Sequence, residues 1–124
     1  MSTARNKAIA RRFFEEAVAR QCEQTADTLV TPNAVFHGPL GRFTGPDGIK
    51  RFSRRLRSAY PDYRIAVEDV IADGDRVAAR WTLRGTQRGE LLGVPPTGKQ
   101  TTVQGVGWLR LADGKIAETW MAEY

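Results

Sequence analysis

The chain has 124 residues, of which 41% are hydrophobic and 27% are charged, the balance of an ordinary globular protein. This length predicts one domain, residues 1–124, with a single hydrophobic core. The formal net charge of +5 permits anionic partners but does not require them. One cysteine excludes an internal disulfide, the N-terminal residues lack the apolar stretch of a signal sequence, and no apolar run reaches membrane-spanning length. We therefore expect a cytoplasmic protein with no membrane partner.

The first half of the chain predicts three helices and one short strand. Apolar residues recur at helical spacing in three segments, and prolines and glycines separate them. The expected elements are a first helix capped by Ser2 or Thr3 and running to about Arg20, a second helix from about Glu23 to Val30, a strand from Ala34 to His37, a loop from Gly41 to Asp47, and a third helix that ends before Pro61.

The second half predicts four long antiparallel strands joined by hairpins. Each strand segment is rich in β-branched and aromatic residues that alternate with polar ones. The expected strands are Tyr63–Ala72, Arg76–Thr86, Thr101–Leu111 and Lys115–Tyr124. Asp-Gly pairs at 73–74 and 113–114 suit tight turns between antiparallel strands. The run Gly93–Gly98 contains two prolines and predicts a rigid loop before the third of these strands.

Helices that precede an antiparallel sheet indicate an α+β fold. We expect a cone-shaped, curved antiparallel sheet of four long strands plus one short strand, with the three helices packed on its concave face. Alternation places a set of polar and aromatic residues on the outer face: Arg80, Thr82, Arg84, Gln104, Trp108 and Arg110. A tryptophan on that face predicts a partner surface, most simply a homodimer through the outer sheet face.

Five segments that cover nearly the whole chain carry a family resemblance: Asn6–Glu16, Gly45–Phe52, Asp75–Arg84, Gly85–Gly98 and Asp113–Trp120. The pattern Gly-Thr-x-x-Gly-Glu-x-x-Gly-x-Pro-Pro-Thr-Gly-Lys over residues 85–99 is the most specific. The chain resembles the SnoaL-like polyketide cyclase family of the nuclear-transport-factor-2-like superfamily. The resemblance implies the conical α+β fold and, usually, a homodimer. The chemistry stays open, because this fold hosts cyclases, isomerases, epoxide hydrolases, dehydratases and non-catalytic binders.

The resemblance also implies a catalytic position on the last strand. Family cyclases use an aspartate directly after the tryptophan of the Gly-Lys-Ile-x-Glu-x-Trp motif as general acid and base for an intramolecular aldol closure. Met121 occupies this position, and methionine cannot transfer protons. The positions of the ketosteroid isomerase base and acid correspond to Gly38 and Gly107, and those of the limonene-epoxide-hydrolase set fall near Leu83, Trp81 and Met121. None of these residues reproduces a known catalytic set.

Strand and helix alternation predicts a pocket for a flat, apolar ligand. Its expected lining residues are Phe13, Phe36, Phe52, Leu56, Tyr60, Trp81, Leu83, Gln87, Gly107, Leu109, Thr119 and Met121. Two residues are candidates for acid–base catalysis, His37 and Glu123. Imidazole changes charge near neutral pH, which suits a general base. The alternative is that His37, at a strand end, forms a hydrogen bond with a backbone group or is exposed. Glu123 shares a strand face with Met121, although a solvated chain end is the alternative.

No histidine, cysteine and carboxylate cluster has metal-ligand spacing, and no glycine-rich phosphate loop follows a strand, so we expect no metal and no cofactor. Cations between Lys50 and Arg57 face away from the buried aromatic residues Phe52 and Tyr60, which argues against nucleic acid binding. The sequence thus predicts a cofactor-independent cyclase or isomerase acting on a small hydrophobic, polyketide-like or aromatic metabolite. The alternative is a non-catalytic ligand-binding or interaction protein on the same scaffold.

Overall fold

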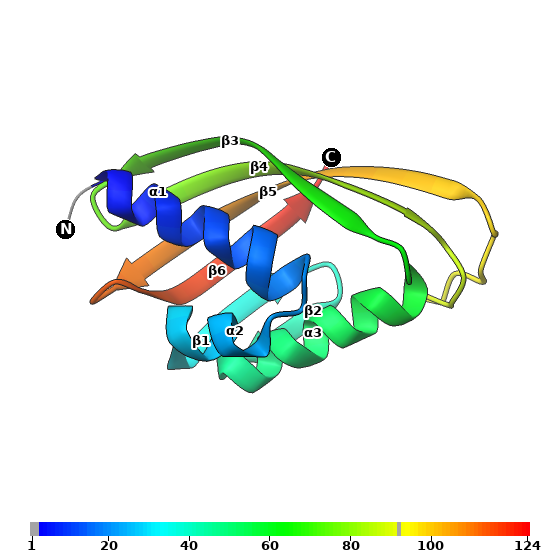
Figure 1. The fold of residues 1–124 in the computed structure, drawn as a ribbon, viewed down its shortest axis with the longest axis horizontal. Coiled ribbons are helices and arrows are strands. Elements are labelled where there is room, and N and C mark those ends of the chain that lie inside the picture. Colours follow the sequence, from blue (N-terminus) through cyan, green and yellow to red (C-terminus); the bar gives the residue numbers. More distant parts are fainter. Residues whose placement is uncertain (1–2, 92) are drawn as a thin grey trace.

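The computed structural model describes residues 3–91 and 93–124 of the chain. Its elements, in chain order, are α1 (Thr3–Arg12), the π-helical turn η1 (Phe13–Val18), α2 (Glu23–Leu29), β1 (Val30–Gly38), β2 (Gly41–Thr44), α3 (Gly45–Ala59), β3 (Arg64–Asp73), β4 (Arg76–Thr86), β5 (Gln100–Ala112) and β6 (Lys115–Glu123). Figure 1 shows the helices on one side of a single sheet. The predicted α+β class is confirmed.

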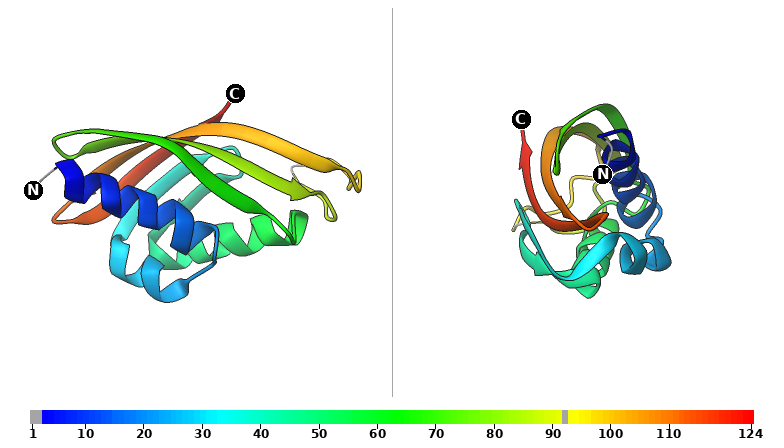
Figure 2. Two further views of the ribbon diagram at one scale, coloured as in Figure 1. Left: turned by 45° about the horizontal axis from the view of Figure 1, so that its top comes forward. Right: turned by 90° about the vertical axis from the view of Figure 1, so that its left-hand side faces the viewer.

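The sheet has six strands in the order β2-β1-β6-β5-β4-β3. Neighbouring strands are antiparallel, except that β1 and β6 run parallel. The sheet curves around the helices without closing into a barrel (Figure 2). Helix α1 packs on β3 and β4, whereas α3 packs on β1 and β2. The predicted placement of the helices on the concave face is therefore confirmed.

Two features of the sheet correct the sequence prediction. Residues 41–44, expected in a loop, form strand β2, and the short strand expected at 34–37 extends over all of β1. The sheet is mixed rather than antiparallel, because β1 runs parallel to β6. Hairpin signals report only on strands that follow each other in the chain, so no local pattern indicates the relative direction of two strands so far apart.

The other elements lie close to their predicted positions. Strands β3 to β6 begin and end within one residue of the predicted bounds. The first helix ends at Val18 rather than near Arg20, and its last 6 residues form a π-helical turn. Ser2, one of the two proposed caps, lies outside the described residues. None of the helices in the described part of the chain is long and apolar enough to cross a membrane.

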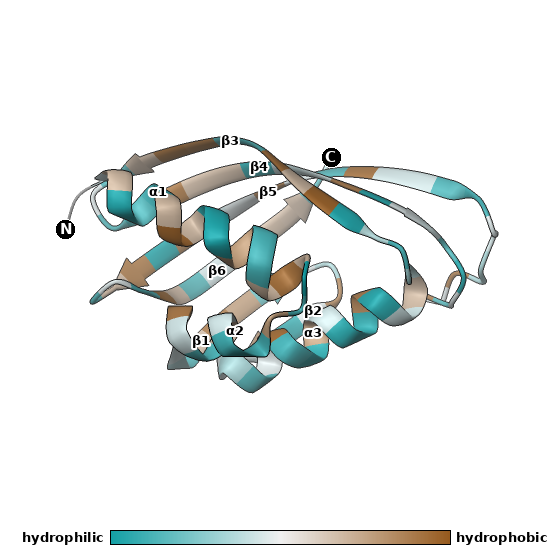
Figure 3. Ribbon diagram, viewed as in Figure 1, coloured by the Kyte–Doolittle hydropathy of each residue, from teal (hydrophilic) through white to brown (hydrophobic). Residues whose placement is uncertain are grey.

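The core lies between the concave face of the sheet and the helices, and Figure 3 shows apolar segments along α1 and along the strands. Phe13 and Phe14 of η1 and Phe36 of β1 are each at most 2% exposed. The Phe13 ring centroid lies 5.1 Å from that of Phe14 and 5.7 Å from that of Phe36. Protein side chains therefore fill much of the space that the curved sheet encloses.

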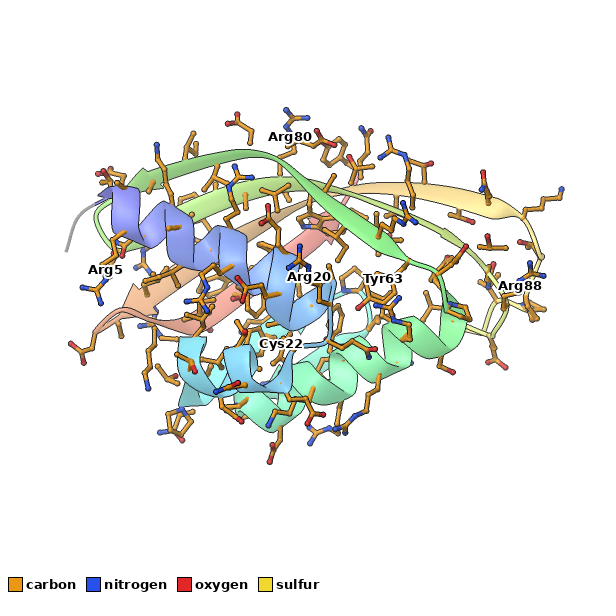
Figure 4. All side chains as sticks on the ribbon, viewed as in Figure 1. Arg5, Arg20, Cys22, Tyr63, Arg80 and Arg88 are labelled. Atoms are coloured by element: carbon orange, nitrogen blue, oxygen red, sulfur yellow. The ribbon has the colours of Figure 1, made fainter. Side chains whose placement is uncertain are left out.

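Arg57 of α3 contacts the segment after η1 and the segment before β3, and so connects three parts of the chain around the core. Its guanidinium donates to the carbonyl oxygen of Ala19 at 2.7 Å and to that of Pro61 at 3.0 Å, and it lies 3.8 Å from the Tyr63 ring centroid. The Tyr63 hydroxyl donates to the carbonyl oxygen of Val18, and Figure 4 shows this tyrosine between η1 and α3. These bonds fix the end of η1 and the start of β3 relative to α3.

Candidate functional site

A cavity of about 120 Å³ lies between the concave face of the sheet, η1 and α3. Its wall is mostly apolar and is formed by Phe14, Val18, Leu40, Phe52, Leu56, Tyr60, Ile65, Trp81, Leu83, Leu91, Val103, Met121 and Glu123. Glu123 supplies the one carboxylate among the described wall residues. An apolar cavity with few polar groups suits a small hydrophobic ligand.

Strand alternation explains one wall of the cavity. Ile65 of β3 lies opposite Leu83 of β4, and Leu83 lies opposite Val103 of β5, so the three form a row across the concave face. Their neighbours in sequence point to the convex face, because successive side chains in a strand alternate. The row is apolar and forms one side of the cavity.

The loop between β4 and β5 is held on α3 and brings Leu91 to the cavity. The backbone N–H of Gly89 donates to the carbonyl oxygen of Ala59 at 3.2 Å. The Gln87 side-chain amide donates to the carbonyl oxygens of Gly89 and Val94, each at 3.3 Å. Gln87 was expected to line the pocket, but its amide is used inside this loop and the residue lies outside the cavity wall.

Met121 and Glu123 lie on the concave face of β6, as their spacing predicts. Met121 is half-buried. A Cβ added at Gly38 of β1 would lie 3.6 Å from the Cβ of Met121, so the methionine side chain fills the space beside β1. Glu123 lies opposite Gly105 of β5 and is exposed to solvent. Its carboxylate has no hydrogen bond or ion pair with another described residue, so it is free to contact a ligand.

Gly105 and Gly107 make room for protein side chains rather than for a ligand. A Cβ added at Gly105 would lie 2.2 Å from Cζ2 of Trp81, and one added at Gly107 would lie 2.8 Å from Cζ of Phe14. Gly107 was expected to line the pocket. The tryptophan and phenylalanine rings instead occupy that space, which is why the cavity is small.

Predicted and observed wall residues overlap in part. The cavity wall contains seven predicted residues, namely Phe52, Leu56, Tyr60, Trp81, Leu83, Met121 and Glu123. Four other predicted residues lie in the packed core at no more than 1% exposure: Phe13, Phe36, Leu109 and Thr119. Alternation identifies the concave face correctly, but it does not distinguish the packed part of that face from the open part.

His37 lies on the convex face, away from the cavity. In β1 the neighbouring Phe36 points inward and pairs with Thr119, so His37 points outward beside Trp120. Its Nε2 lies 2.9 Å from Oε2 of Glu118, and its ring stacks on Trp120 with centroids 5.6 Å apart. The hydrogen bond with His37 lowers the pKa of Glu118 below its usual value, and Arg110 acts in the same direction.

Several wall residues were not predicted from the sequence. Ile65 and Val103 follow the same alternation as Leu83, so the pattern contained the signal for them. Leu40 comes from the turn between β1 and β2, and Leu91 comes from the β4–β5 loop. Residues in loops carry no periodicity, and only the folded chain brings them to the cavity.

Within residues 3–91 and 93–124, no group of three or more histidine, cysteine and carboxylate side chains is placed to hold a metal ion.

Comparison with known proteins gives a family. The model of the SnoaL-like polyketide cyclase family matches residues 8–123. A protein from Jannaschia sp. CCS1 named as a SnoaL-like polyketide cyclase is similar in structure, with a TM-score of 0.86 and 27% identity over 98% of this chain and 86% of that one. AclR from Streptomyces galilaeus, named as a hydroxylase, gives a TM-score of 0.81 and 29% identity over 99% and 77% of the two chains. IdmH from Streptomyces antibioticus, named as a polyketide cyclase, gives a TM-score of 0.77 and 27% identity over 95% of this chain and 91% of that one. No match was found among curated protein sequences.

Proposed function

Because the chain belongs to the SnoaL-like polyketide cyclase family, we propose that it is a cofactor-independent cyclase or isomerase. Its substrate is a small, largely apolar, polyketide-like or aromatic metabolite that binds in the cavity. One observation carries the proposal: an apolar cavity whose described wall contains a single carboxylate, that of Glu123.

Glu123 is the acid–base residue in this proposal. Its carboxylate removes a proton from a carbon next to a carbonyl group, and the electron pair of the broken C–H bond passes to the carbonyl oxygen. In a cyclisation, the resulting enolate carbon attacks a second carbonyl carbon of the same molecule, and Glu123 returns the proton to the new alkoxide. In an isomerisation, the proton returns to a different carbon. The apolar wall contributes by holding the reacting carbons together.

The position of Glu123 explains how activity can persist with Met121 at the usual aspartate position. Residues two apart in a strand share a face and are separated by roughly 6–7 Å. The carboxylate of Glu123 is therefore on the same wall as the side chain of Met121, nearer the chain end. The proposed substrate binds closer to the cavity mouth than it would if an aspartate stood at position 121.

Proton exchange tests the proposal without knowledge of the natural substrate. We expect the protein to accelerate deuterium incorporation into the methyl group of acetophenone in D2O, measured by proton NMR. Glu123→Gln keeps the side chain's shape and should lower this acceleration by about a hundredfold or more. The control is Glu118→Gln, which changes a carboxylate on the convex face and should leave the rate unchanged. Full exchange activity in Glu123→Gln would contradict the role of Glu123.

The alternative is a binding protein without catalysis, and the replacement of the family aspartate by Met121 favours it. This alternative predicts that acetophenone binds in the cavity but that its methyl protons exchange at the uncatalysed rate. The same NMR samples distinguish the two functions, because ligand shifts report binding and loss of the methyl signal reports exchange.

The convex face supports a proposal about the partner, which we take to be a second copy of this chain. Residues Ile71, Ala78, Trp108, Trp120 and His37 lie opposite one another in a single row across five strands. Ile71 is 62% exposed, Trp108 49% and Trp120 40%. An exposed apolar row of this kind is typical of an interface, and a two-fold dimer would pair the row with itself.

A further inference from the structure

The indole nitrogen of Trp81 is a buried hydrogen-bond donor without a partner. Trp81 is 8% exposed and lines the cavity, and its Nε1 makes no hydrogen bond within the described part of the chain. Buried N–H groups are almost always paired in native proteins, so an unpaired one indicates that a partner is missing. Buried atoms of Asn6, Arg76 and Thr119 also lack partners among the described residues, but none of these three residues lines the cavity.

Strand pairing places Trp81 in the same row as Glu123. Trp81 of β4 lies opposite Gly105 of β5, and Gly105 lies opposite Glu123 of β6. A Cβ added at Gly105 would lie 2.7 Å from Cε2 of Trp81, the carbon bonded to Nε1. The indole ring therefore crosses from β4 over β5 toward β6. Because Gly105 has no side chain, no residue separates the ring from Glu123 along the row.

The chemistry of the indole group limits what its partner can be. An indole N–H donates a hydrogen bond and cannot accept one, so the missing partner must present an acceptor. A carbonyl oxygen is such an acceptor on a largely apolar molecule. When a base removes a proton from the adjacent carbon, negative charge develops on this oxygen, and a donor fixed in a water-poor cavity stabilises it.

We propose that Nε1–H of Trp81 donates to the carbonyl oxygen of the substrate, which is an aryl or cyclic ketone whose adjacent carbon faces Glu123. This inference rests on the proposed function, because it requires the cavity to bind the substrate. The C–H bond breaks, the proton passes to Glu123, the electron pair passes to the oxygen, and the indole N–H bond stays intact. The cavity of about 120 Å³ is close to the roughly 150 Å³ that holds benzene in an engineered protein, so one ring fits.

The experiment compares two probes of similar shape, acetophenone and ethylbenzene, of which only the first has a carbonyl oxygen. The indole N–H groups of the 15N-labelled protein each give one NMR signal, and the signal of Trp81 is assigned by its absence in Trp81→Phe. We expect acetophenone to shift the Trp81 signal downfield and ethylbenzene not to do so. Trp108 and Trp120 on the convex face are internal controls whose signals should not respond to either probe.

Binding affinities give a second readout. Trp81→Phe keeps an aromatic ring but removes the donor, so it should weaken acetophenone binding by about threefold to tenfold and leave ethylbenzene binding unchanged. If this variant does not fold, Trp108→Phe and Trp120→Phe identify the signals of the other two tryptophans. The downfield shift of the remaining signal in the wild-type protein then decides. Glu123→Ala removes the acceptor oxygens of this side chain and should leave the Trp81 signal of the ligand-free protein in place. A change there would mean that Glu123 is the partner of the indole, and the inference would be overturned.

The remaining outcomes separate this inference from the proposed function. If both probes bind in the cavity and the Trp81 signal does not respond to the ketone, the donor role of Trp81 is overturned while the binding function stands. If neither probe shifts any signal from residues of the cavity wall, the cavity is not a ligand site for this class of molecule, and both the inference and the proposed function are overturned.

Discussion

The concave and convex faces of the same strands differ in how their polar groups are satisfied. On the concave face, Nε1 of Trp81 is buried and Glu123 borders the cavity, and neither has a partner among the described residues. On the convex face, Glu118 accepts from His37 at 2.9 Å and lies 3.5 Å from Arg110. Figure 4 shows Arg80 pointing away from the helices on this same side. The convex face thus carries a paired carboxylate, whereas Nε1 of Trp81 and the carboxylate of Glu123 beside the cavity are unpaired.

This difference separates residues that stabilise from residues that bind. A partly exposed ion pair contributes little to stability, and its partners are already satisfied by each other. A buried donor without a partner costs free energy, and a ligand that supplies an acceptor recovers it. The functional chemistry of this protein is therefore expected on the concave face, and the convex face is expected to bind a partner through its apolar row.

The largest expected effect concerns the convex face. Trp108→Glu places a charge in the middle of the apolar row, and in a two-fold dimer the change occurs twice. Because an interface tryptophan is typically worth about 2 kcal/mol or more, we expect dimerisation to weaken by roughly a thousandfold. Analytical ultracentrifugation measures the dimerisation of this variant. The control is Gln24→Glu, which adds the same charge on α2. A wild-type protein that sediments as a monomer at micromolar concentration would refute the dimer.

The second prediction concerns the packing of Trp81 on the concave face. A Cβ at Gly105 would lie 2.2 Å from the Trp81 ring, so Gly105→Ala must displace the ring or the strand. We expect the free energy of unfolding to fall by about 2–3 kcal/mol, the cost of overpacking a core. Urea denaturation measures the loss. Gln104→Ala, one residue away on the convex face, should change the stability by less than about 0.5 kcal/mol.

The two faces also show how far the sequence predicts this fold. Alternation and Asp-Gly turns located β3 to β6 within one residue, because each hairpin is a local structure with local signals. The parallel pairing of β1 with β6 and the short strand β2 were missed. Both depend on contacts between distant parts of the chain, and the four residues of β2 are too few to show a period.

The candidate site was predictable to a lesser extent. Period-two alternation placed Met121 and Glu123 on the concave face and gave Trp81 and Leu83 as wall residues. It could not show that Gly105 and Gly107 lie under the rings of Trp81 and Phe14, because a glycine in a strand does not indicate which ring covers it. The role proposed for His37 assumed a position at the pocket. The strand parity that turns Phe36 inward places this histidine on the other face.

The third prediction tests the position of residue 121 directly. Met121→Asp should place a carboxyl group in the apolar wall, where burial raises its pKa above the ordinary value of about 3.9. Burying this group without a partner should lower the free energy of unfolding by about 1–3 kcal/mol. Carbon-13 NMR titration and thermal unfolding measure the two effects. Ala122→Asp is the matched control, because Ala122 is exposed on the convex face, and its carboxyl group should titrate normally.

The smallest expected effect concerns the pair of His37 and Glu118. The hydrogen bond with His37 is the main cause of the lowered pKa of Glu118, so His37→Ala should raise that pKa toward its ordinary value, while Arg110 keeps it somewhat below. A carboxyl group with a lowered pKa in the folded state stabilises the protein above its unfolded-state pKa, and this stabilisation is lost as the pH falls through the folded-state value. The wild-type protein should therefore lose its small advantage in folding stability over His37→Ala as the pH falls below about 4.5. Carbon-13 titration of Glu118 and acid unfolding of both proteins measure this change.

The same variant tests the separation of the two faces. His37 and the cavity lie on opposite sides of the sheet, so His37→Ala should leave the exchange of acetophenone protons unchanged. Glu123→Gln, by contrast, should abolish most of this exchange without moving the pKa of Glu118. If His37→Ala slows the exchange as strongly as Glu123→Gln does, the histidine reaches the substrate in solution. The assignment of catalysis to the concave face alone would then be wrong.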